Sequence, residues 1–148
     1  MADNKSAVLI CTCGKQLQLG YDFLETQTGK MILAASVTVP DGVCQEEGLE
    51  KIAKLLKEND GHLVIAACSS QKIQPRIDQY LKSHDVDSTQ VQYVNIREHS
   101  AWVHKDIDAA SKKSADMIRG ALARSAKAVK RSLETKEIPA HVTVIGGG

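Results

Sequence analysis

Short runs of consecutive apolar residues alternate with amphipathic segments along this chain, and this alternation restricts the fold more than any other feature. Residues 7–10 and 63–67 are the clearest runs, and uninterrupted runs of this length are typical of strands buried on both faces. Residues 49–56 and 73–81 instead repeat apolar side chains at helical spacing. The alternation predicts an α/β fold in which a mainly parallel sheet is flanked by helices, in a Rossmann-like three-layer arrangement.

The other segments extend this pattern less regularly. Residues 31–39 and 91–96 are predicted strands, whereas residues 15–28 have weak helical spacing that Gly20 interrupts. Apolar side chains from about Ala101 to Leu133 trace one stripe, which predicts a long C-terminal amphipathic helix.

A few residues mark where elements begin and end. Pro40-Asp41-Gly42 is a turn. Ser69 or Ser70 is a candidate cap for the next helix, in which Pro75 is expected to be tolerated only in the first turn.

Length and charge restrict the class of protein. The 148 residues suffice for one ordinary domain, and a net charge of +1 gives no sign of a nucleic acid partner. No segment approaches the roughly 20 apolar residues that span a bilayer, and no secretory signal is apparent. We therefore expect a soluble cytoplasmic protein without membrane insertion, in which thiols stay reduced and are available for metal or redox chemistry.

All four cysteines lie at predicted element boundaries. Cys11 and Cys13 follow the first strand, Cys68 follows the strand at 63–67, and Cys44 precedes a helix. Because functional groups gather beyond the carboxyl ends of parallel strands, we expect the four thiols to meet at one sheet edge. Helix starts near Cys44 and Cys68 are expected to lower the pKa of these thiols.

Four thiolates suit either a 4Fe–4S cluster or a structural zinc ion. The single residue between Cys11 and Cys13 departs from the familiar spacing, so the residues alone leave other interpretations open. Cys68, which follows Ala66-Ala67, is also explained as a small buried apolar residue, and Cys11 and Cys13 as a dithiol redox pair. A thiol enzyme with Cys68 as nucleophile and His99 as base is a further alternative, for which no acid partner is evident.

The segment from Arg97 to His104 follows the strand at 91–96. In its functional interpretation, Arg97 and His99 face the metal centre and donate hydrogen bonds to its sulfur atoms, or His99 or His104 is a direct ligand. In the ordinary interpretation, Arg97 is solvated and Trp102 anchors the long helix on the core.

The C-terminal residues resemble the beginning of a dinucleotide-binding unit. A predicted strand from His141 to Ile145 runs into Gly146-Gly147-Gly148. The sequence ends before any helix whose start would hold a pyrophosphate, so the alternatives are a last strand with a glycine tail or the front portion of a longer flavoprotein.

Taken together, these motifs resemble the N-terminal domain of the heterodisulfide reductase A subunit. The resemblance spans nearly the whole chain, and it is carried by five segments: Ile10-Cys11-Thr12-Cys13-Gly14, Val43-Cys44, Val64-Ile65-Ala66-Ala67-Cys68-Ser69, Asn95 to Lys105 and Val144-Ile145-Gly146-Gly147-Gly148.

This resemblance implies an electron-transfer domain at 1–136 that binds one 4Fe–4S cluster. The implied ligands are Cys11, Cys13, Cys44 and Cys68. Residues 137–148 are the implied linker and truncated start of an FAD-binding domain, so that FAD binds only in a longer relative. The implied partners are other subunits of an anaerobic heterodisulfide-reductase-like complex, and the sequence is also compatible with a homodimer.

The chain departs from the family pattern at two places. Family members usually have cysteine where this chain has Ser100, and they have a Pro-Arg-Thr-His-Glu-Pro-like run where this chain has Ser70 to Pro75. The alternatives to an electron-transfer domain are a redox-silent docking domain, with structural zinc or no metal, and a thiol-based redox enzyme.

Overall fold

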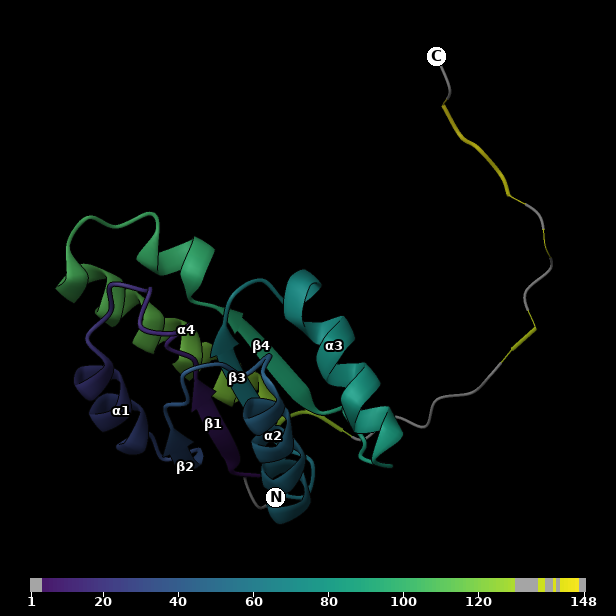
Figure 1. Cartoon of the computed structure of the whole chain (residues 1–148), viewed down its shortest axis with the longest axis horizontal. Coiled ribbons are helices and arrows are strands. Elements are labelled where there is room, and N and C mark those ends of the chain that lie inside the picture. The colour runs from purple at the N-terminus through teal and green to yellow at the C-terminus, as the bar shows by residue number, and fades with distance from the viewer. Residues whose placement is uncertain (1–3, 130–135, 138–139, 141, 147–148) are drawn as a thin grey trace.

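A four-stranded parallel sheet forms the centre of the domain, with strand order β2-β1-β3-β4 (Figure 1). The computed structural model describes residues 4–129, 136–137, 140 and 142–146. Its elements in chain order are β1 (Ser6–Ile10), α1 (Tyr21–Gly29), β2 (Ala34–Thr38), α2 (Glu46–Glu58), β3 (Leu63–Ala67), α3 (Ser70–Ser83), β4 (Val91–Asn95), the π-helix η1 (Arg97–Ala101) and α4 (Ile107–Ala126). The predicted α/β fold is confirmed.

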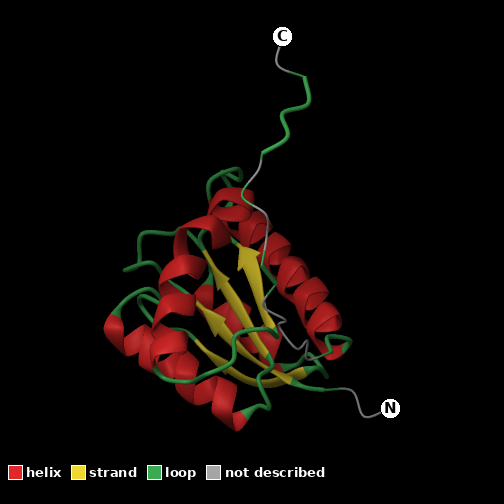
Figure 2. Ribbon diagram, turned by 90° about the vertical axis from the view of Figure 1, so that its right-hand side faces the viewer, coloured by secondary structure: helices red, strands yellow, loops and turns green. Residues whose placement is uncertain are grey.

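Helices cover both faces of the sheet, so the domain has three layers (Figure 2). Alternate strand residues face opposite sides: Leu9 and Ile65 pack with α2 and α3, whereas Val8 and Val64 pack with α1 and α4. Every residue of β1 and β3 is buried, which explains their uninterrupted apolar sequences.

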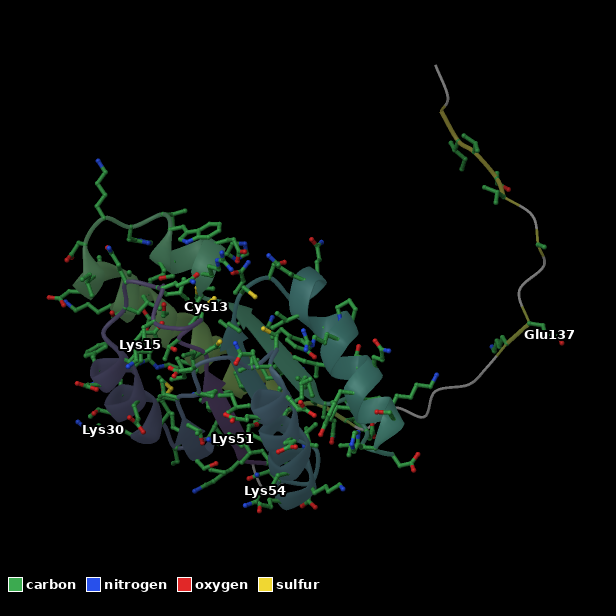
Figure 3. The ribbon with its side chains drawn as sticks, in the orientation of Figure 1. Cys13, Lys15, Lys30, Lys51, Lys54 and Glu137 are labelled. Atoms are coloured by element: carbon green, nitrogen blue, oxygen red, sulfur yellow. The ribbon has the colours of Figure 1, made fainter. Side chains whose placement is uncertain are left out.

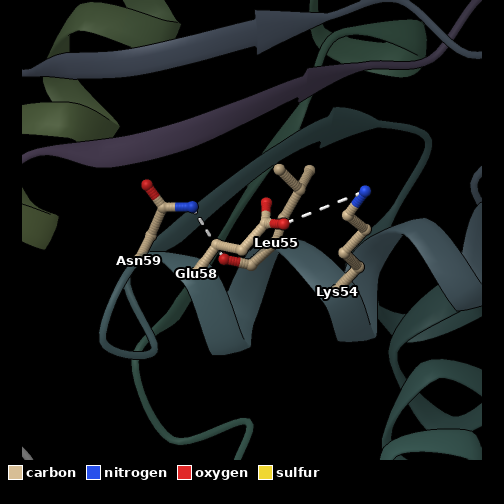
Figure 4. A network of polar contacts seen from close by, with 4 residues as sticks. All are labelled: Lys54, Leu55, Glu58 and Asn59. Atoms are coloured by element: carbon tan, nitrogen blue, oxygen red, sulfur yellow. Dashed lines mark hydrogen bonds and ion pairs between the residues drawn. The ribbon is translucent and has the colours of Figure 1, made fainter.

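Helix α2 shows how the local sequence determines which face of a helix is buried and where the helix ends. Its apolar face, which includes Leu49 and Ile52, is buried against the sheet. The helix ends at Glu58, after which the backbone N–H and the side chain of Asn59 both donate to the Leu55 carbonyl, at 3.1 and 2.8 Å (Figure 4 shows the side-chain bond). The exposed ion pair between Lys54 and Glu58, at 3.9 Å, adds little stability.

The strand order places a topological switch point between β1 and β3. From β1 the chain passes through α1 to β2 on one side, and from β2 it passes through α2 back across β1 to β3 on the other side. In open α/β sheets, ligands bind in the crevice beyond the carboxyl ends of the two strands at such a point. Cys11 and Cys68 are the first residues after these two strands.

The predicted long helix begins later than expected. Residues 97–101 form the π-helix, and α4 begins only at Ile107 because the Asp106 carboxylate accepts hydrogen bonds from the backbone N–H groups of Asp108 and Ala109. The predicted end near Leu133 lies outside the described residues.

Three smaller expectations also differ from the structure. Helix α3 begins at Ser70, so Pro75 lies beyond its first turn, where its missing N–H removes one helical hydrogen bond. Ser69 occupies the N-cap position, but its side chain makes no capping hydrogen bond. Residues 142–146 form no strand, and Val142, Val144 and Ile145 are exposed, because no neighbouring strand pairs with them. His141 lies outside the described residues.

Candidate metal centre

All four cysteines line one cavity of about 230 Å³ at the switch point. Cys11 and Cys13 reach it from the loop after β1, Cys68 from the turn between β3 and α3, and Cys44 from the loop before α2. Figure 3 shows Cys13 beyond the end of β1 toward which the strand arrows point. All four thiols are free. The predicted convergence of the cysteines on one sheet edge is confirmed, whereas their role as metal ligands stays a prediction.

The loop that carries Cys11 and Cys13 has a tightly curled backbone. Cys13, Gly14 and Lys15 all have positive φ angles, at 54°, 65° and 63°, and for residues other than glycine this conformation costs of order 1–3 kcal/mol each. The curl lets the Cys13 N–H donate to Cys11 Sγ at 3.4 Å. N–H groups aimed at sulfur favour its anionic form, so this contact offsets part of the cost of ionising the buried Cys11 thiol.

Hydrogen bonds join this loop to the loop that carries Cys44. The N–H groups of Thr12 and Gly14 donate to the carbonyls of Pro40 and Asp41, at 3.0 and 2.7 Å. The Thr12 hydroxyl donates to Asp41 Oδ1 at 2.9 Å, and the Tyr21 hydroxyl donates to the Thr12 carbonyl at 3.4 Å. The relative positions of three cysteines therefore depend on these contacts.

Burial dominates the protonation chemistry of Cys11 and Cys68. Burial raises the pKa of Cys11, and the N–H groups of Val43 and Cys13 oppose it only in part. Burial also raises the pKa of Cys68, and the negative charge of Glu98 adds to this effect. The expectation that a helix start lowers the pKa of Cys68 is therefore wrong, because desolvation outweighs the helix dipole at this position.

Arg97 lies beside the Cys13 thiol, as in the functional interpretation of its segment. Its Nη1 donates to Cys13 Sγ at 3.9 Å, whereas its buried Nε has no hydrogen-bond partner among the described residues. Glu98 Oε2 is also buried without a partner among them. The arginine supplies positive charge and a spare donor near the cavity, and the glutamate partly offsets that charge.

His99 and His104 are not brought to the cysteine cavity. His99 lines a separate cavity of about 660 Å³ between β4, α4 and the start of α3. It lies two positions after Arg97, and residues two apart in a helical turn do not face each other. His104 Nδ1 instead lies 2.9 Å from the Ser100 carbonyl.

Ser100 contacts α4, whereas Trp102 lies at the surface. Ser100 is fully buried, and its hydroxyl donates to the Ala110 carbonyl at 2.7 Å, which joins the π-helix to α4. Ser100 does not line the cysteine cavity. Trp102 is 61% exposed, so the expectation that it anchors the long helix on the core is wrong.

The donors around the cavity fit an iron–sulfur cluster. Four cysteine sulfurs are the usual ligand set of a 4Fe–4S centre, and the N–H donors at Cys11 and the spare Nε of Arg97 suit its anionic sulfur atoms. No three His, Cys, Asp or Glu side chains within the described part of the chain form a group able to hold a metal ion. The fit therefore depends on the shared cavity and its donors, not on a preformed group of ligands.

The roles of three residues of the site could not be predicted from the sequence: Thr12, Tyr21 and Asp41. Thr12 and Asp41 are 29 positions apart, and only the strand order brings their loops together. Asp41 lies in the predicted Pro-Asp-Gly turn, but nothing in that pattern identifies its hydrogen-bond partner. The tyrosine hydroxyl is likewise placed by the packing of α1 against α4 and β2.

Comparison with known proteins identifies relatives of one kind. No protein-family model matches the chain. The chain is 31% identical over 147 residues to the second heterodisulfide reductase iron–sulfur A subunit of Methanopyrus kandleri, covering 95% of this chain and 22% of the relative. It is 30% identical over 148 residues to the A subunit of the ferredoxin:CoB-CoM heterodisulfide reductase of Methanosarcina mazei, covering 95% and 18%.

A third relative matches the whole chain. This is the A subunit of the H2/formate:CoB-CoM heterodisulfide,ferredoxin reductase of Methanococcus maripaludis, at 29% identity over 156 residues, which covers 100% of this chain and 23% of the relative. The chain thus spans about a fifth of the length of these curated relatives. No helix in the described residues has the length and apolar character needed to cross a membrane. The resemblance predicted from the motifs is confirmed: along nearly its whole length, the chain is homologous to a segment of the heterodisulfide reductase A subunit.

Proposed function

We propose that this domain binds one 4Fe–4S cluster through Cys11, Cys13, Cys44 and Cys68 and transfers electrons in a heterodisulfide-reductase-like complex. The observation that carries the proposal is that these four thiols, which lie up to 57 positions apart, line one cavity at the switch point of the sheet. When bound, such a cluster accepts and donates single electrons.

The surroundings of the cavity support an anionic cofactor more than a set of inert buried cysteines. N–H donors point at the sulfur of Cys11, and Arg97 Nη1 donates to the sulfur of Cys13. Cys13 itself has a backbone conformation that is costly for a residue other than glycine. Cysteines that merely fill the core would need neither feature.

The relatives support the same cofactor class. Several of them are named as iron–sulfur subunits of heterodisulfide reductase. We infer that the present chain likewise has an iron–sulfur domain, at residues 1–136. Residues 137–148 then form a linker and the start of an FAD-binding domain, the other redox subunits are its partners, and the cytoplasm is its compartment.

The proposal is tested by anaerobic reconstitution of the purified chain with ferrous iron and sulfide. We expect a brown protein with a broad absorption band at the violet end of the visible spectrum. It should contain about four irons and four acid-labile sulfides per chain, and its spectrum should bleach reversibly on addition of dithionite. Reconstitution with zinc alone, in a parallel sample, provides the matched control.

Two results would contradict the cluster. A colourless protein that binds one zinc per chain and excludes iron would indicate a structural zinc site and a docking role. A protein that binds neither metal, but forms and releases a disulfide between Cys11 and Cys13, would indicate thiol-based redox chemistry.

A further inference from the structure

Trp102 is the single tryptophan of the chain, and most of its side chain is exposed. A large aromatic side chain at the surface gains little from apolar burial, so a specific contact has more influence on its conformation. That contact is Arg97, whose guanidinium carbon lies 4.4 Å from the centre of the indole ring. This distance is within the range of a cation–π interaction.

The same guanidinium group also contacts the candidate metal centre. Arg97 Nη1 donates to Cys13 Sγ at 3.9 Å. Arg97 is therefore held between a surface indole on one side and a cysteine sulfur on the other. Cys13, Arg97 and Trp102 form a continuous series of contacts from the cavity to the surface.

The π-helix is what allows this stacking. Trp102 lies five positions after Arg97, and its N–H donates to the Arg97 carbonyl at 2.9 Å, which is the i→i−5 bond of a π-turn. In an α-helix, with 3.6 residues per turn, side chains five apart point in clearly different directions. The wider turn brings them closer to the same side, and such single π-turns often occur at functional sites.

We propose that Trp102 is a positioning residue for the metal centre: by stacking on Arg97, it holds Nη1 against the sulfur of Cys13. An unrestrained arginine samples many rotamers, most of which would direct its charge into solvent. The indole restricts Arg97 to conformations that keep the donor at the sulfur. This inference rests on the proposed function, because it assigns the restrained donor to a cluster ligand.

The expected consequence is a change in reduction potential. A hydrogen bond to a ligand sulfur stabilises the more negative, reduced cluster and so raises its potential. Loss of the indole frees Arg97 to move into solvent and weakens that bond. Trp102→Ala should therefore shift the midpoint potential to more negative values, in the same direction as Arg97→Gln.

The test is a double-mutant cycle on the reconstituted protein, with midpoint potentials from anaerobic redox titration of wild type, W102A, R97Q and the double variant. We expect W102A to lower the potential in the wild-type background and to have no further effect when Arg97 is already Gln. W102F, which keeps an aromatic face, should restore most of the wild-type potential. A shift from W102A that persists undiminished in the R97Q background would overturn the inference.

A second measurement does not depend on the cluster. In the metal-free protein, fluorescence from Trp102 should become more accessible to acrylamide quenching when R97Q removes the stacked guanidinium, whereas K105Q, a change at a nearby exposed lysine, should not alter it. Unchanged quenching in R97Q would also overturn the inference. Wild-type protein that takes up no cluster would instead refute the proposed function, so the two failures are distinguishable.

Discussion

The Thr12 hydroxyl donates a 2.9 Å hydrogen bond to Asp41 Oδ1, across 29 positions of sequence. Thr12 lies between Cys11 and Cys13, whereas Asp41 lies three residues before Cys44. One side-chain contact therefore joins the loops that carry three of the four candidate ligands. Because Thr12 is only 6% exposed, water cannot easily replace its partner if the contact is lost.

We expect Thr12→Val to weaken the site while the domain stays folded. The variant removes a hydrogen bond to a carboxylate, a contact of about 2 kcal/mol, and leaves the two loops joined by the backbone hydrogen bonds from Thr12 and Gly14. Cluster loss to a ferrous chelator should be faster than in wild type. Thr12→Ser, which keeps the hydroxyl, is the matched control and should retain most of the wild-type rate. Equal rates in all three proteins would show that the contact does not hold the site together.

Cys11→Ala and Cys68→Ala should each abolish the cluster or convert it to a form with less iron. These residues directly follow the two central strands at the switch point, and each supplies one of the four thiols that line the cavity. Iron content and the electron paramagnetic resonance spectrum measure the outcome. Ser36→Ala, a change at an exposed position of β2, is the control for iron lost during purification and reconstitution. Wild-type iron content in both cysteine variants would show that the proposed ligand set is wrong.

Two helical glycines should respond in opposite ways to alanine. A Cβ at Gly48 would lie 2.7 Å from Val43 Cα and closer still to the Gly42 carbonyl oxygen, so the loop before Cys44 would have to move. Gly120, in α4, has nothing within 4 Å of the position that a Cβ would take. We expect Gly48→Ala to cost about 1–3 kcal/mol by overpacking, and Gly120→Ala to stabilise by about 0.5–1 kcal/mol through its better helix propensity.

Urea unfolding of the metal-free protein measures both glycine variants. Cluster retention adds a second comparison, since Gly48→Ala should speed cluster loss by displacing the Cys44 loop, whereas Gly120→Ala should not. Stabilisation by Gly48→Ala would show that the close approach of α2 to this loop is not required.

The strands at the switch point were predictable because burial leaves so few choices for their residues. Residues 63–67 form β3 with the predicted bounds, and β1 differs from its predicted run by only one residue. Once parallel strands are accepted, the convergence of Cys11 and Cys68 follows from topology. Cys44 was placed correctly because the amphipathic pattern of α2 locates the loop before it.

The errors have a common physical origin in local geometry. The apolar stripe continues through residues 101–106, so periodicity could not reveal the π-helix or the start of α4 at the Asp106 cap. That π-helix places Arg97 and His99 on different sides and leaves Trp102 exposed. Similarly, the pKa of Cys68 depends on how deeply the thiol is buried, and burial of one side chain at a strand end is decided by tertiary packing.

Tyr93 should make the protein sensitive to alkaline pH. Burial, and to a lesser extent the charge of Asp78, raise the pKa of its hydroxyl above the usual value near 10. The folded state therefore keeps the proton when the unfolded chain loses it, so the stability contributed by Tyr93 is fully present below about pH 10 and is lost as the pH rises further. Its Oη is buried without a hydrogen-bond partner among the described residues.

Tyr93→Phe should therefore be neutral or slightly stabilising at pH 7, because it removes a buried and unpaired polar atom. Above about pH 10 the variant should become progressively more stable than wild type, since phenylalanine has no proton to lose. Urea midpoints of the two metal-free proteins between neutral and alkaline pH measure this difference. The buried thiols of Cys11 and Cys68, whose pKa values are also raised, lower the stability of both proteins equally at alkaline pH. The effect of Tyr93 is therefore measured by the difference in stability between the variant and wild type. If the urea midpoints of the two proteins differ by the same amount at every pH, the Tyr93 hydroxyl reaches solvent when it ionises.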